Sequence, residues 1–259
     1  LLRDPVYRER FRKQWSNKLK GRAYHRDLAE ARIVECPDDT LVGLTFAEVA
    51  VRRGRDRIDT FLDLQAEFGN DLRWTTTVGN TNEESVAWIV NQPQAQIGFS
   101  DAGAHLRNMA FYNSGLHLLR RVRDAERDGH PFMSVERAVH RLTGELSDWF
   151  GLDAGHLRLG DRADVVIVDP EHLDDTIDDY HEAPMPYFGG LSRMVRRNDD
   201  TVRATLVAGE VVFEDGAFAP GFGRSRRTGT FLRAGQTHRG SPSSLDVSPP
   251  SRALSEATR

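Results

Sequence analysis

The chain has 259 residues, which is enough for one large domain or two smaller ones with a sizeable core. Its formal charge of -4 gives no electrostatic footprint for nucleic acid or for an anionic membrane surface. A single cysteine, Cys36, excludes an internal disulfide framework, and no apolar run approaches the roughly 20 residues of a membrane helix. We therefore expect a cytoplasmic protein with no nucleic-acid or membrane partner.

The first part of the chain predicts helices that alternate with short strands. Thr45 and Glu48 have the spacing of a capping box, in which each side chain satisfies a backbone donor at a helix start. Strands separated by helices favour parallel pairing with helical crossovers. The expected helices cover residues 5–20, 45–53, 55–69 and 82–90, and the expected strands cover residues 31–36 and 72–78.

Residues 96–105, QIGFSDAGAH, form the stretch around which the chain is organised. A short apolar segment leads into Ser-Asp and then into small residues, which predicts a buried strand with Asp101 at its carboxyl end. In parallel α/β folds, functional groups gather at that end of the strands. Taken alone, Asp101 is equally well interpreted as a cap of the next helix.

The second part of the chain changes character near Gly151. Helices are expected over residues 113–128 and 134–150, the latter capped by Ser134. Two-residue periodicity then predicts two strands over 156–170 and a hairpin over 202–216. Beyond residue 221, polar residues dominate and predict disorder. The predicted divisions are 1–150, with helices and parallel strands, 151–220, an all-β portion, and 221–259, a disordered tail.

Three stretches resemble N-acyl-D-amino-acid deacylases of the amidohydrolase superfamily, within a similarity that spans about residues 30–220. Residues 98–105, GFSDAGAH, are similar to the G-S-D-[GA]-x-x-H element of that family. Residues 142–170 are similar to the segment where those proteins leave their barrel, and residues 208–216 to their closing hairpin. The resemblance implies an α/β fold, with the carboxyl-terminal part of a TIM-like (β/α) barrel over 1–150 and part of a β-sandwich over 151–220.

The same resemblance implies a metal-dependent hydrolase of non-peptide carbon–nitrogen bonds, with one or two divalent metals, usually zinc. In that family an aspartate at the last barrel strand takes a proton from metal-bound water and passes it to the leaving nitrogen. Asp101 matches this position and is the expected catalytic and metal-contacting residue. His105 is expected to orient Asp101 or to line the substrate pocket, and a structural role is equally open. Arg107 is the nearest candidate for holding the substrate carboxylate.

The sequence also departs from the family. No His-x-His pair occurs among the nine histidines, and a lone cysteine such as Cys36 is most often a buried small hydrophobe. We therefore expect the carboxyl-terminal part of a longer enzyme, inactive by itself and without stoichiometric zinc, because a catalytic zinc needs three or more protein ligands.

The substrate expected for the whole enzyme is a small N-acyl amino acid or a related amide, and homo-oligomer formation is left open. Two alternatives also remain. One is a cyclic amidohydrolase similar to dihydroorotases and hydantoinases. The other is a non-catalytic binding subunit or a decayed homologue. A His-x-His pair after a strand, in sequence upstream of Leu1, would favour the enzyme.

Overall fold

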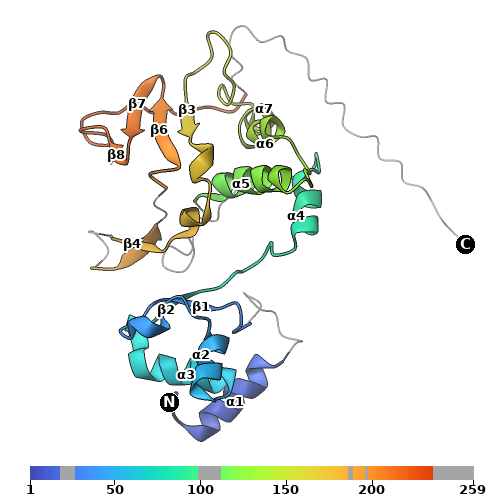
Figure 1. The fold of residues 1–259 in the computed structure, drawn as a ribbon. Helices are drawn as coiled ribbons and strands as arrows, with labels where there is room; N and C mark the ends of the chain where they lie inside the picture. Colours follow the sequence, from blue (N-terminus) through green and yellow to red (C-terminus); the bar gives the residue numbers. More distant parts are fainter. Residues whose placement is uncertain (18–26, 99–111, 186–188, 196–197, 236–259) are drawn as a thin grey trace, which may run out of the picture. The chain divides into compact units, whose positions relative to one another are not determined.

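The computed structural model describes residues 1–17, 27–98, 112–185, 189–195 and 198–235 (Figure 1). The chain divides into two compact units, Leu1–Ala95 with Tyr180–Met194, and Gln96–Asp179 with Val195–Arg259. Both contain helices and strands, in agreement with the predicted mixed class, whereas the TIM-like barrel and the β-sandwich stay predictions. The predicted divisions near residues 150 and 220 stay predictions, whereas the two compact units divide after Ala95, and the Tyr180–Met194 segment belongs to the first of them.

One helix of the first unit begins at the capping residues that the sequence indicated. The capping box of Thr45 and Glu48 is present, and Gly54 ends that helix in the left-handed conformation at φ 60°. Asp56 and Asn82 cap the next two helices. The elements are α1 (Pro5–Trp15), β1 (Arg32–Glu35), η1 (Asp39–Leu41), α2 (Phe46–Arg53), α3 (Arg57–Phe68), η2 (Gly69–Asp71), β2 (Arg73–Thr75), α4 (Glu83–Val90), β4 (His181–Pro184) and β5 (Ser192–Val195).

The prediction of parallel pairing is wrong for β1 and β2. They pair antiparallel, with Ile33 opposite Trp74 and Arg32 opposite Thr75. Two helices, α2 and α3, separate these strands and pack on one another. The two helices return the chain to the end of the sheet where β1 finished. Because β2 then starts at that end, it runs in the opposite direction.

The core of the first unit is aromatic and aliphatic. Phe46 has no exposed surface and lies edge-on to Phe61 and Trp74, with ring centroids 5.0 and 5.8 Å away. Ile33 and the buried thiol of Cys36 belong to the same cluster. This burial agrees with the interpretation of Cys36 as a small hydrophobe.

In its described part, the second unit combines three α-helices and two short 3-10 helices with an antiparallel sheet in the order β3-β6-β7-β8 (Figure 1). The predicted hairpin is confirmed, and its turn residues Ala208 and Gly209 have φ angles of 53° and 81°. The elements are α5 (Ser114–Arg127), α6 (Val135–Leu142), α7 (Gly144–Phe150), β3 (Val165–Val168), η3 (Pro170–His172), η4 (Asp175–Asp178), β6 (Val202–Val207), β7 (Glu210–Glu214) and β8 (Ala217–Phe218).

Several predicted elements differ in this unit. The helix expected over 134–150 is broken at Thr143, whose φ and ψ of -128° and -89° are not helical. Residues 156–162 form no strand, and neither do residues 96–98, while the rest of the expected strand that leads to Asp101 lies outside the described ranges. Residues 221–235 of the expected tail are described and contact the unit. Arg226, for example, pairs with Glu210 at 2.7 Å. In the described ranges, no helix is both long and apolar enough to cross a membrane.

Candidate functional site

The three predicted site residues, Asp101, His105 and Arg107, fall within 99–111 and lie outside the residues that the structure describes. Their placement stays a prediction. The structure does describe the backbone on either side of this segment, and both sides belong to the second unit.

Gly98, the described residue just before this segment, packs closely against α7. A Cβ atom at Gly98 would lie 3.1 Å from Cδ2 and 3.2 Å from Cδ1 of Leu146. These separations are tighter than ordinary van der Waals contacts, so any larger residue at Gly98 requires Leu146 to move. Glycine therefore allows the backbone at the first residue of the motif to lie directly against α7.

After this segment, the first side chain with a buried polar contact is that of Asn113, at the start of α5. Asn113, which is only 6% exposed, donates a hydrogen bond from Nδ2 to the carbonyl oxygen of Ile177 at 2.7 Å. Its side chain makes no capping bond to α5. The amide instead ties the start of α5 to the 175–178 turn, and a second amide, that of Asn198, donates to the same carbonyl at 3.3 Å.

Basic side chains along helix α5 contact residues 170–178, the segment that includes the 175–178 turn. Nε2 of His117 lies 3.0 Å from an Asp178 oxygen, and Arg120 pairs with Asp175. Arg123 donates to two backbone carbonyls in residues 170–173, each at 2.6 Å. The sequence signal for this docking was a helix with basic residues on one face and the acidic run DDTIDD at 174–179.

The structure brings together two parts of the stretch that resembles the barrel exit of the deacylases. A Cβ atom at Gly144 would lie 2.8 Å from Cε1 of His156, so the imidazole rests on the start of α7. Nε2 of His156 then lies 2.8 Å from a carboxylate oxygen of Asp148. Gly155 approaches the break between α6 and α7 even more closely. A Cβ atom there would lie 2.5 Å from Oγ of Ser147 and 2.8 Å from the carbonyl oxygen of Thr143.

A buried ion pair supports the same corner of the unit. The side chain of Arg141 on α6 has 0% exposure and pairs with Glu145 on α7, which also accepts a 2.6 Å contact from Arg137. Sequence reasoning did not single out these residues, because an arginine in an amphipathic helix is ordinarily solvated. Removing one partner of such a pair would leave a buried charge uncompensated.

Substitution at Gly155 provides a test of this packing. Gly155→Ala is expected to lower the free energy of unfolding by roughly 1–2 kcal/mol, because alanine is strained in the left-handed conformation. The overlap of its Cβ atom with Thr143 and Ser147 should cost roughly 1–3 kcal/mol more. The matched control is Gly160→Ala, because Gly160 has a similar φ of 94° with nothing within 4 Å of a Cβ atom, against 81° at Gly155. Urea unfolding of the two variants measures the difference, and equal losses would contradict the close approach.

A polar network in the first unit joins strands that are distant in the sequence. Glu182 of β4 accepts hydrogen bonds from Ser192 and Tyr180 and pairs with Arg73 of β2 at 3.3 Å. The hydrogen bonds from Ser192 and Tyr180 lower the pKa of the Glu182 carboxyl, and burial together with Glu182 raises the pKa of the Tyr180 hydroxyl. This network explains why the 180–194 segment belongs to the first unit.

The described side chains do not form a metal centre. Among them, no group of three or more His, Cys, Asp or Glu residues is arranged to hold a metal ion. Four of the described histidines instead each face one carboxylate: His117 and His156 as above, His172 at 3.1 Å from Asp169, and His140 at 3.9 Å from Glu145. These residues therefore do not fit a catalytic zinc, which takes three protein ligands at one point.

Comparison with solved structures finds partial similarity to D-aminoacylases. N-acyl-D-glutamate deacylase from Bordetella bronchiseptica, complexed with zinc and a phosphonate inhibitor, matches with 24% identity and a TM-score of 0.42 over 80% of this chain and 38% of that chain. A D-aminoacylase matches with 20% identity and a TM-score of 0.42 over 80% of this chain and 39% of that chain. The chain resembles part of each of these proteins.

Curated relatives share much more of the sequence. The uncharacterized proteins Rv2913c of Mycobacterium tuberculosis and Mb2937c of Mycobacterium bovis are each 52% identical over 242 residues, covering 91% of this chain. The chain spans about 40% of the length of these relatives. No protein-family model matches it.

Proposed function

We propose that the longer protein to which this chain corresponds hydrolyses the amide bond of N-acyl-D-amino acids, with Asp101 as its general base and acid. The observation that carries this proposal is the GFSDAGAH run at residues 98–105, which resembles the deacylase element residue for residue at Asp101 and His105. The close approach of Gly98 to Leu146 and the buried amide of Asn113 support it, since a catalytic site needs well-fixed flanking backbone.

Asp101 ends the proposed reaction in the same protonation state in which it began. Its carboxylate accepts a proton from the attacking water, and the carboxylic acid so formed returns that proton to the nitrogen that leaves as the amine. His105 is proposed to orient this carboxylate or to line the pocket. Arg107 is proposed to hold the α-carboxylate of the substrate, since a guanidinium binds a carboxylate through two parallel hydrogen bonds. A divalent metal in the whole protein would polarise the amide carbonyl, and we assign it no ligand among the described side chains.

The test is hydrolysis by the full-length protein, followed as amine release from a panel of N-acetyl-D-amino acids and their L enantiomers. We expect release from D substrates only, and none from the 259-residue chain assayed in parallel. Turnover of dihydroorotate or hydantoin instead would indicate a cyclic amidohydrolase. An absence of hydrolysis in the metal-supplemented full-length protein would overturn the proposal and favour a binding role.

A further inference from the structure

The first unit contains a solvent-open hollow of about 490 Å³ whose lining is rich in arginine. The lining side chains come from the amino-terminal segment, from α1, from the end of α2 and the turn after it, and from α3. They are Arg3, Arg8, Arg53, Arg55, Asp63 and Glu67. All of them belong to one compact unit, and none is near the Asp101 segment in sequence.

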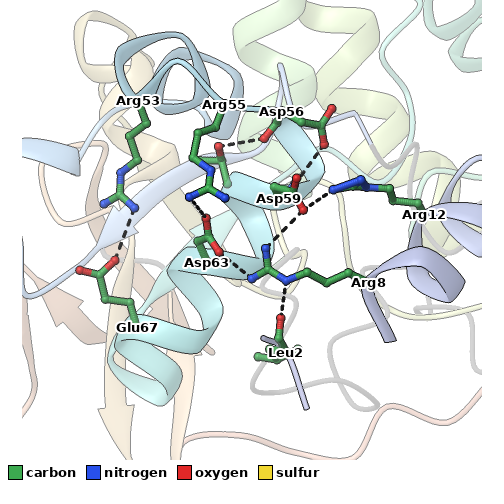
Figure 2. A network of polar contacts seen from close by, with 10 residues as sticks. Leu2, Arg8, Arg12, Arg53, Arg55, Asp56, Asp59, Asp63 and Glu67 are labelled. Carbon is green, nitrogen blue, oxygen red and sulfur yellow. Dashed lines mark hydrogen bonds and ion pairs between the residues drawn. The ribbon is translucent and has the colours of Figure 1, made fainter. Parts of the chain in front are cut away.

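One of these arginines, Arg8, stabilises the walls of the hollow through its own hydrogen bonds and ion pairs. Arg8, whose side chain is 14% exposed, donates to Asp63 at 2.6 Å and to Asp59 at 3.3 Å (Figure 2). Its Nε also donates to the carbonyl oxygen of Leu2 at 2.7 Å, which fixes the segment that carries Arg3. Arg12 pairs with Asp59 as well, so that Asp59 is fully engaged outside the lining.

The remaining arginines are only loosely compensated. Arg55 reaches Asp63 at 3.5 Å, although that carboxylate already accepts the short contact from Arg8, and Arg53 reaches Glu67 at 3.4 Å (Figure 2). Within the described part of the chain, Arg3 has no acidic partner. Four guanidinium groups thus face two carboxylates, which leaves an excess of two positive charges in the hollow.

We propose that this hollow binds a small multivalent oxyanion of the phosphate class. Guanidinium groups present planar, paired donors that match phosphate oxygens, and charge-assisted hydrogen bonds of this kind are roughly twice as strong as neutral ones. The donors come from Arg3, Arg53 and Arg55. The ion pair of Arg8 with Asp63 stabilises the walls of the hollow. A nucleic acid is a poor alternative, because the chain carries a net charge of -4 and the arginines gather in one hollow rather than along a stripe.

The experiment is a calorimetric titration of the chain with inorganic phosphate, at constant ionic strength maintained with chloride. We expect saturable binding that Arg55→Gln and Arg3→Gln each weaken by about tenfold, since each removes hydrogen bonds from a charged donor. The matched control is Arg52→Gln. Arg52 is a neighbouring arginine on α2 that contacts the Thr40 carbonyl and does not line the hollow, and its loss should leave the affinity unchanged.

A gain-of-binding variant separates an anion site from a purely structural network. Glu67→Gln removes the carboxylate that competes for Arg53 and should tighten phosphate binding severalfold. The proposal is overturned if phosphate shows no saturable binding, if Arg52→Gln weakens it as much as Arg55→Gln, or if Glu67→Gln leaves it unchanged or weaker. Failure here would not touch the proposed hydrolysis, because that assay reports on the Asp101 segment.

Discussion

Asp101→Asn in the full-length protein is expected to lower kcat by at least about 10²–10⁴-fold, the usual contribution of general acid–base catalysis. Asparagine keeps the size of the side chain and most of its hydrogen bonds, but it cannot accept a proton from water at neutral pH. The measurement is kcat on an N-acetyl-D-amino acid, with a thermal melting curve recorded for the same variant. The melting midpoint should move little, because the change is nearly isosteric.

Two further variants delimit the role of Asp101. His105→Ala should lower kcat less than Asp101→Asn, because we assign His105 an orienting or lining role. Arg107→Lys should mainly raise KM, since lysine keeps the charge but loses the two-pronged hydrogen bonding. Retention of more than about a tenth of wild-type kcat by Asp101→Asn, or failure of that variant to fold, would identify Asp101 as a structural cap.

Phe46→Ala is expected to destabilise the first unit by about 3–5 kcal/mol, which is the usual cost of deleting a buried aromatic ring. Phe46 has 0% exposure and contacts two other rings, those of Phe61 and Trp74. The loss is a large fraction of the roughly 5–15 kcal/mol that stabilises an ordinary domain. Urea unfolding followed by tryptophan fluorescence is suitable, because Trp74 lies against the ring that is removed.

The control for this substitution is Val51→Ala on the same helix. Val51 is 80% exposed, so its truncation should change the free energy of unfolding by no more than about 0.5 kcal/mol. Because the chain contains two compact units, the two variants should be compared by the transition of the first unit alone. Similar losses for both variants would show that Phe46 does not lie in the core.

For the candidate site, the sequence indicated which residues to consider but not the contacts that surround them. The identity of Asp101, His105 and Arg107 as candidates came from the resemblance of GFSDAGAH and its continuation to the deacylase element. The anchors around them required the structure. The hydrogen bond of Asn113 to Ile177 joins residues 64 positions apart, and the contact of Gly98 with Leu146 joins residues that no local pattern relates. The arginine hollow is likewise built from segments whose proximity the sequence does not reveal.

The sequence by itself determined the features whose causes lie within a few residues. The capping box at Thr45, the cap at Ser134 and the Ala208-Gly209 turn were predicted and are present, because each depends on hydrogen bonds or dihedral angles among near neighbours. Tertiary structure alone decided the antiparallel pairing of β1 with β2, the break at Thr143 and the burial of Arg141. β1 and β2 are separated by two helices, and Gly155 packs closely on the break at Thr143, so contacts between separate segments outweigh local preference there. The ion-pair partner of Arg141, Glu145, lies only four residues along the chain, but the complete burial of Arg141 also requires packing that its helical pattern does not indicate.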